Sequence, residues 1–260
     1  MRVGLSSAAF YGRMETEEQA AYLTDFPVEC CEVFLQTFSE YTAEFGALVR
    51  QKLGRIPCVA VHPKGLQFEL DLFGRSERQK EDAFRIFTGV CDAGQAMGAR
   101  YYVFHGPPSI NTPRTPGSIH KVYDGLARMH KIASERDMEV LWENVSWCAL
   151  RTIADVEEVK ATTPLRFAFD VKQALRAGQD PLAMLRAMGN RCAHVHALDQ
   201  TAKGELCLPG EGVVDWHGIA RQLWEINYGG SVILEPYDAQ ARRERDLDRS
   251  LRWLRKVLQE

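Results

Sequence analysis

Four short segments in the second half of the sequence end in side chains that can bind a cation. They are rich in apolar, β-forming residues, and their last residues are Glu143, Asp170, His196 and Glu235. Carboxylate oxygens with one imidazole nitrogen suit a borderline or hard divalent cation such as Mn²⁺, Zn²⁺, Co²⁺ or Mg²⁺. Because no cysteine thiolate belongs to the set, the pattern argues against a structural zinc site. It predicts one divalent metal ion with open positions for a substrate.

The four segments belong to a longer alternation of strand-like and helix-like segments. The strand-like runs lie near residues 2–6, 30–35, 58–62, 101–105, 139–143, 166–170, 192–196 and 231–235. Strands that alternate with helices predict a parallel sheet, and eight such units favour closure into a (β/α)₈ TIM barrel of about 250 residues. The chain has 260 residues and no Pro/Gly/Ser-rich linker, so we expect residues 1–260 to form one domain.

A closed barrel would bring further polar side chains to the same mouth. The active sites of such barrels lie at the carboxyl ends of the strands, where alternation along each strand makes the four predicted ligands converge. His62 and His105 end the third and fourth strands, and we expect them to contact the substrate rather than the metal. Glu32 lies inside an apolar strand, where an unpartnered charge is costly. It is therefore expected to touch either the substrate or a ligating side chain.

Composition excludes several classes of function. The chain carries 32 basic and 35 acidic residues, which gives a net charge of -3 and no sign of a nucleic-acid-binding or membrane-binding surface. It contains no apolar run of about 18 residues, the length that spans a membrane. The segment that begins at Met1 reads as a strand rather than a signal peptide. The seven scattered cysteines form no C-x-x-C pair and suit a reducing cytoplasm.

Several ordered motifs resemble the xylose isomerase-like TIM-barrel superfamily of sugar phosphate isomerases and epimerases. In chain order they are Val-Glu-Cys-Cys-Glu-Val-Phe-Leu, Val-Phe-His-Gly, Leu-Trp-Glu-Asn, Phe-Ala-Phe-Asp, His-Val-His-Ala-Leu-Asp, Leu-Pro-Gly-Glu-Gly-Val-Val-Asp-Trp and Ile-Leu-Glu-Pro. The resemblance spans essentially the whole chain. It implies that Glu143, Asp170, His196 and Glu235 bind Mn²⁺ or a similar ion. It also implies that Glu143 and Glu235 are the catalytic acid and base on opposite faces of a bound sugar, which react through an enediolate.

The sequence departs from this family at two positions that bear on the substrate. Ketose 3-epimerases of the family place a histidine three residues after the ligand aspartate, where this chain has Gln173. They also place an arginine a few residues beyond the ligand histidine, where only Lys203 could substitute as a substrate-binding residue. Endonuclease IV, a DNA repair relative with three zincs, needs the same extra histidine and an Asp-x-His motif. This chain lacks both, so the site is expected to be mononuclear.

Three functional classes follow from these observations. The leading interpretation is a divalent-metal-dependent isomerase or epimerase of a sugar or sugar phosphate, which could form a homo-oligomer. The alternative is a dehydratase or lyase on a keto-sugar or inositol derivative, which would form the same enolate and expel a β-hydroxyl. The third class is a ligand-binding barrel without catalytic activity. A DNA repair enzyme is the least favoured reading.

Overall fold

The structure, a computed structural model, describes residues 1–109, 122–236 and 243–260. Eight parallel strands close into a barrel in the order β1-β10-β7-β6-β5-β4-β3-β2, as predicted. The strands are β1 (Arg2–Ser6), β2 (Cys30–Leu35), β3 (Cys58–Pro63), β4 (Tyr101–Phe104), β5 (Glu139–Glu143), β6 (Arg166–Asp170), β7 (Cys192–Ala197) and β10 (Ser231–Leu234). A two-stranded antiparallel ribbon, β8 (Asp199–Gln200) with β9 (Leu206–Cys207), follows β7.

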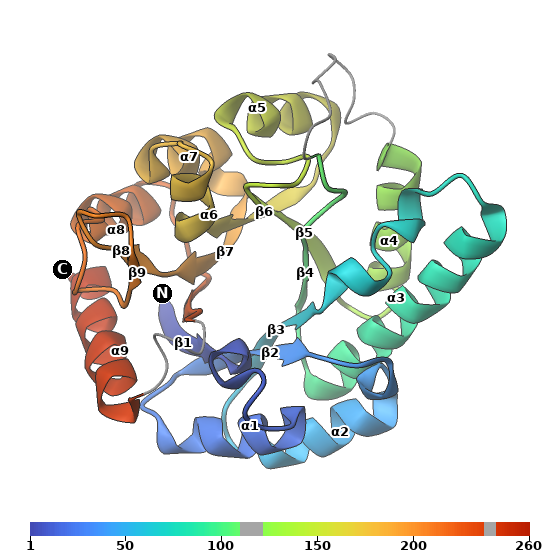
Figure 1. Ribbon diagram of the computed structural model, residues 1–260, viewed down its shortest axis with the longest axis horizontal. Helices are drawn as coiled ribbons and strands as arrows, with labels where there is room; N and C mark the ends of the chain where they lie inside the picture. Colours follow the sequence, from blue (N-terminus) through green and yellow to red (C-terminus); the bar gives the residue numbers. More distant parts are fainter. Residues whose placement is uncertain (110–121, 237–242) are drawn as a thin grey trace.

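Helices surround the ring of strands (Figure 1). They are α1 (Thr16–Tyr22), α2 (Ala43–Lys52), α3 (Glu77–Met97), α4 (Tyr123–Ser134), α5 (Ile153–Thr162), α6 (Val171–Arg176), α7 (Pro181–Met188), α8 (Trp216–Glu225) and α9 (Glu244–Gln259). The longest, α3, begins after the capping residue Ser76 and ends at Gly98, whose φ of 80° lies in the left-handed region that glycine adopts without strain.

Two apolar layers hold the barrel together. Outside the strands, apolar side chains pack against the helices in one large buried cluster. Inside, small and medium side chains fill the barrel, among them Ala60, Leu141, Ala168 and Ile233. These inward residues share a strand face with the residues that end the strands, because side chains alternate along a strand. The alternation therefore fixes which polar groups reach the mouth.

Strand register sets the relative heights of the polar groups at the mouth. His196 of β7 lies opposite Asp170 of β6 and opposite Ile233 of β10. Glu143 of β5 lies opposite Ala168, one inward position below Asp170. The four strand ends thus form a continuous arc, with the two glutamates on the outer strands of the arc and the aspartate and histidine between them.

Candidate metal centre and active site

The four predicted metal ligands lie together at the carboxyl ends of β5, β6, β7 and β10. Glu143, Asp170, His196 and Glu235 each offer one ligand atom, and these atoms all lie within 4.8 Å of one another. The Nδ1 atom of His196 is 2.9 Å from Glu143 Oε1, 3.6 Å from Glu235 Oε2 and 3.9 Å from Asp170 Oδ2. All four side chains are buried. The barrel geometry on which the predicted ligand set depends is therefore present.

The chemistry of this cluster fits a divalent cation. Glu143 Oε2 and Asp170 Oδ2 are buried and lack a hydrogen bond of good geometry, although each has one nitrogen nearby, His105 Nε2 at 3.2 Å and Lys172 Nζ at 3.1 Å. Burial raises the pKa of Asp170 to about 6, and Glu143 and Glu235 contribute to the rise while Lys172 opposes it. A cation would compensate both unsatisfied oxygens and the concentrated negative charge. That these four residues are metal ligands remains a prediction.

Asp170 has a second role in the backbone. Its Oδ1 atom accepts a hydrogen bond from the Gln173 amide at 2.8 Å and so caps the first turn of α6. The side chain of Asn144 forms two hydrogen bonds with the backbone of Asp170. Its Oδ1 accepts a hydrogen bond from the Asp170 amide, and its Nδ2 donates one to the Asp170 carbonyl. These bonds leave only Oδ2 directed at the cluster. Asn144 was not singled out in the sequence, where it reads as an ordinary loop residue after β5.

A buried glutamate orients the candidate histidine ligand from below. Glu32 is 0% exposed, and its Oε2 lies 3.0 Å from His196 Nε2 and 2.9 Å from His194 Nε2. Its Oε1 accepts a hydrogen bond from Ser6 at 3.2 Å. Because Nε2 of His196 donates to Glu32, Nδ1 is left to face the carboxylates, which is the usual role of a carboxylate behind a ligating histidine. Glu32 therefore contacts a candidate ligand, and no part of it lines the cavity above.

The charges around His196 are strong in the absence of a cation. Burial alone would lower the pKa of His196, but the surrounding carboxylates, Glu235 first among them, raise that pKa well above its ordinary value. Burial would likewise raise the pKa of Glu143, yet contacts with His105 and His196 hold it well below its usual range. The metal-free site therefore stores a proton on the imidazole between ionised carboxylates.

A cavity of about 300 Å³ opens above the cluster. His62 and His105 line it with Glu143 and Glu235, and the Nε2 atoms of the two histidines are 2.8 Å apart, so one donates a hydrogen bond to the other. His105 Nε2 is 3.2 Å from Glu143 Oε2, and His62 Nδ1 is 3.4 Å from Glu235 Oε1. Each histidine thus contacts one of the two predicted catalytic glutamates.

Aromatic and basic side chains complete the wall of this cavity. Tyr11 and Phe34 line it with their rings 5.4 Å apart, and Lys64 Nζ donates a hydrogen bond of 2.9 Å to the Tyr11 hydroxyl. Lys203, expected to bind substrate, lies elsewhere. It is exposed in the turn between β8 and β9 and does not belong to the described lining of the cavity. Its position in a hairpin tip, rather than at a strand end, explains the difference.

A lysine that the sequence pattern does not predict lies in the centre of the site. Lys172 is 2% exposed, and its Nζ lies 3.1 Å from Asp170 Oδ2 and 3.2 Å from Glu235 Oε2. It places one positive charge between two candidate metal ligands and also lines the cavity. The available signal was its position in the first helical turn, two residues after the candidate ligand Asp170.

Gln173, one of the two positions where the sequence departs from the family pattern, bonds to the loop after β5. Its Oε1 accepts hydrogen bonds from the Ser146 amide at 3.2 Å and from the Ser146 hydroxyl at 2.8 Å. The side chain therefore ties the start of α6 to the loop after β5. At the same time it contributes to the cavity wall, so it is placed to contact a bound ligand.

Residues 21–257 match the family model described as xylose isomerase-like TIM barrel, and the chain belongs to this family. Among curated proteins it is similar to an inosose dehydratase of Clostridium beijerinckii, with 24% identity over 133 residues, or 43% of this chain and 45% of that protein. The chain thus spans about half the length of the curated relatives it matches first.

Solved structures with low sequence identity share the whole fold. A D-psicose 3-epimerase, determined in the presence of D-fructose, superposes with a TM-score of 0.80 at 15% identity and covers 100% of both chains. The IOLI protein, whose structure holds a zinc atom, has a TM-score of 0.73 at 16% identity, and the match covers 99% of this chain and 96% of that one. Within the described residues, no helix has the length and apolar character that crossing a membrane requires.

Proposed function

We propose that this chain is a metal-dependent isomerase or epimerase of a sugar or sugar phosphate. One observation carries the proposal: Glu143 and Glu235 face one cavity, and each contacts one member of the histidine pair His62–His105. Family membership and structural neighbours that are named as sugar epimerases support it. The shared barrel also supports the proposal that residues 1–260 form one domain.

In the proposed reaction, the four candidate metal ligands and the two histidines have different roles. A divalent cation held by Glu143, Asp170, His196 and Glu235 would polarise a substrate carbonyl as a Lewis acid. One glutamate removes the proton from the carbon beside that carbonyl, and the other delivers a proton to the opposite face. His62 and His105 donate hydrogen bonds to substrate oxygens in the cavity. Glu32 acts through His196, because its carboxylate holds the imidazole of that candidate ligand in place.

The contacts also provide a route that resets the two glutamates. After one turnover the first glutamate holds a proton and the second has lost one. Glu143 Oε2 lies 3.2 Å from His105 Nε2, and His105 Nε2 lies 2.8 Å from His62 Nε2. His62 Nδ1 lies 3.4 Å from Glu235 Oε1, so these contacts join the two glutamates through two imidazoles. Imidazoles pass protons readily near neutral pH. The site can therefore recover its starting protonation without releasing the proton to solvent.

A second function is favoured by a specific observation, namely the similarity to proteins named inosose dehydratase. A dehydratase would begin with the same proton removal beside a carbonyl. It would then deliver a proton to a β-hydroxyl, which leaves as water. Glu143 and Glu235 would keep their roles as base and acid.

One experiment separates these functions. The protein is supplied with Mn²⁺ and incubated in D₂O with ketoses, aldoses, their phosphates and keto-inositols, and products are followed by NMR and mass spectrometry. Deuterium on the carbon beside the carbonyl without loss of water supports the isomerase or epimerase. Loss of water supports the dehydratase.

Variants test the roles of the glutamates. Glu143→Gln and Glu235→Gln should each lower turnover by about 10²–10⁴, the usual scale for a lost general acid or base. Glu139→Gln, at the other end of β5, is the matched control and should leave turnover unchanged. Near-normal turnover in both active-site variants with metal bound would contradict the two-glutamate mechanism.

A further inference from the structure

A second cavity opens at the end of the barrel opposite the candidate metal centre. It has a volume of about 530 Å³, within the range of pockets that bind small ligands. The residues that line it come from the amino-terminal ends of the strands, including Arg2 of β1 and Arg166 of β6. This end of a TIM barrel normally contributes to stability rather than catalysis, so a ligand site here is not part of the proposed reaction.

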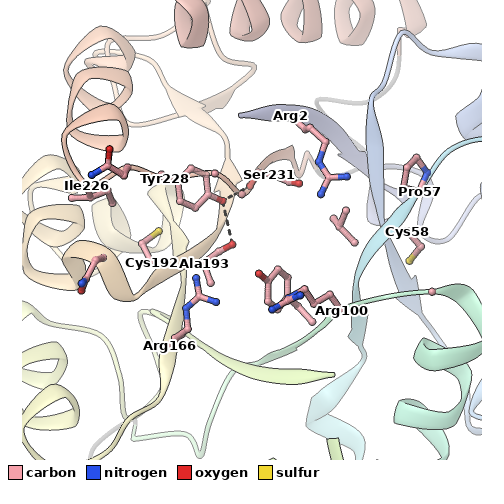
Figure 2. Close-up of a pocket in the computed structure, with 17 residues that line it drawn as sticks. Arg2, Pro57, Cys58, Arg100, Arg166, Cys192, Ala193, Ile226, Tyr228 and Ser231 are labelled. Atoms are coloured by element: carbon pink, nitrogen blue, oxygen red, sulfur yellow. Dashed lines mark hydrogen bonds between the residues drawn. The ribbon is translucent and has the colours of Figure 1, made fainter. Parts of the chain in front are cut away.

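The charge of this cavity is its distinguishing feature. Among the residues that the structure describes, its lining contains three arginines, Arg2, Arg100 and Arg166, and no aspartate or glutamate. Figure 2 shows the three guanidinium groups directed toward one central space, from β1, from β6 and from the residue before β4. Only Arg166 has an acidic partner, Glu139 at 3.2 Å. In the described part of the chain, neither Arg2 nor Arg100 forms an ion pair. Such a concentration of unpaired positive charge is unexpected in a chain of net charge -3.

The Tyr228 hydroxyl on the floor of the cavity is already used within the protein. The Tyr228 hydroxyl donates a hydrogen bond to the Ser231 carbonyl at 2.7 Å, so its polar group is satisfied within the protein (Figure 2). Gly230 packs closely on this ring, since a Cβ there would lie 2.5 Å from the Tyr228 side chain. The turn into β10 is therefore tightly packed against the Tyr228 ring.

The remaining wall is suited to an organic group. The ring of Tyr101 lines the cavity with Pro57 and Ile226, and the Arg100 guanidinium lies 5.9 Å from the centre of that ring. The side chain of Asn227 adds an amide. A bare inorganic ion would fill only a small part of such a volume. An anion that carries a ring or a carbon chain would use both the charged and the apolar walls.

We propose that this amino-terminal mouth of the barrel binds a small phosphate monoester through Arg2, Arg100 and Arg166. The planar guanidinium fork matches phosphate oxygens and pairs with them through two parallel hydrogen bonds. Guanidinium groups from different strands can surround one phosphate, while Tyr101 and its apolar neighbours contact the organic group. The site is independent of the metal centre and of the reaction proposed there.

The proposal is tested by calorimetric titration with two phosphate monoesters, adenosine monophosphate and fructose 6-phosphate, and with adenosine and fructose as uncharged counterparts. At least one phosphate ester should bind at least tenfold more tightly than its counterpart, and more weakly as ionic strength rises. Tighter binding of the nucleotide identifies an aromatic organic group, and tighter binding of the sugar phosphate identifies a hydroxyl-rich one. No binding of either ester up to about 10 mM, well above ordinary metabolite-site affinities, would overturn the proposal.

Charge-matched variants locate the binding. Arg2→Gln/Arg100→Gln should weaken phosphate ester binding at least tenfold, because charge-assisted bonds to phosphate are lost. Arg78→Gln/Arg85→Gln removes the same charge from exposed positions on α3 and should bind as the wild type does. Should the first double variant fail to fold, Arg100→Gln alone, at an exposed position, should weaken binding at least threefold. Equal weakening in both double variants would show nonspecific charge attraction and refute the site.

A further variant separates this site from the metal centre. Glu143→Gln alters the opposite end of the barrel and should leave phosphate ester binding unchanged. Loss of binding in Glu143→Gln with retention in Arg2→Gln/Arg100→Gln would assign the ester to the catalytic cavity and overturn the proposal. Because all these readouts measure binding, they stand whether or not the proposed sugar chemistry is found.

Discussion

Replacing Lys172 with methionine probes the charge balance of the metal centre directly. The ammonium group lies 3.1 Å from Asp170 Oδ2 and 3.2 Å from Glu235 Oε2, and the side chain is 2% exposed. Removing one partner of a buried ion pair costs about 3–5 kcal/mol, because the other charge stays buried without compensation. At about 2–4 °C per kcal/mol for a domain of this size, metal-free Lys172→Met should melt about 6–20 °C below the metal-free wild type.

Metal should reverse this loss. The lysine and a divalent cation would share the carboxylates of Asp170 and Glu235, and two cations about 4 Å apart repel by several kcal/mol at an effective dielectric constant of about 20. Lysine relieves part of this repulsion by moving, so we expect Lys172→Met to bind Mn²⁺ at least about tenfold more tightly than wild type. Since ligand binding stabilises the folded state, Mn²⁺ should raise the melting temperature of the variant more than that of the wild type.

The assay is thermal unfolding in EDTA and in Mn²⁺, with metal affinity measured by competition with a chelating dye. Lys64→Met is the matched control, because Lys64 lines the same cavity but bonds to the Tyr11 hydroxyl and not to a carboxylate. The control should change the melting temperature little in either condition. The reasoning about charge balance fails if Lys172→Met is as stable as wild type in EDTA, or if it binds Mn²⁺ more weakly.

Three further predictions concern the surroundings of the metal. His105→Asn should lower turnover about 10–10²-fold by breaking the route between glutamates, while metal analysis still finds about one ion per chain; stoichiometric metal loss would make His105 a ligand. Glu32→Gln should weaken metal affinity about 10–100-fold, because His196 loses the carboxylate that orients it, and unchanged affinity would exclude this role. Metal binding at pH 7 should release about one proton from His196, whose pKa is raised in the metal-free site. Affinity should fall as the pH drops through about 6, where Asp170 takes up a proton; an indicator dye that records no proton release would contradict this.

The sequence predicts the barrel well because each strand is a short apolar run with clear ends. The predicted strands 30–35, 139–143 and 166–170 coincide with β2, β5 and β6. The barrel closure was also predicted, since the count of strand–helix units alone favours it. Four predicted strand ends differ by one residue: β3 and β7 run one residue further, to Pro63 and Ala197, while β4 and β10 stop one residue earlier, at Phe104 and Leu234.

The candidate site was predictable only where it depends on strand ends. Alternation along a strand places Glu143 and His196 at the mouth without any knowledge of neighbouring loops. Lys172 and Asn144 follow strands in loops or first helical turns, and their roles depend on contacts with other strands. Lys172 reads as an exposed helical lysine, yet it reaches Glu235, 63 residues further along the chain. Lys203 lies in an exposed hairpin rather than in the described cavity lining, and its role in substrate binding stays a prediction.

The choice between epimerisation and dehydration depends on where the second proton goes. Epimerisation needs an acid and a base on opposite faces of one carbon, and both must be restored after each turnover. The cavity provides a nearly symmetric arrangement for this: Glu143 contacts His105, Glu235 contacts His62, and the histidines bond to each other. Dehydration needs a single acid at the leaving hydroxyl and no route between the glutamates. The paired histidines therefore support epimerisation more than elimination. Lys172 adds an asymmetry, because its Nζ lies 3.2 Å from Glu235 Oε2. His196, Lys172 and His62 together outweigh the effect of burial and lower the pKa of Glu235 to about 2. The pKa of Glu143 is also held well below its usual range, so either glutamate can remove the first proton, and the histidine pair then carries a proton back to the one that acts as the acid.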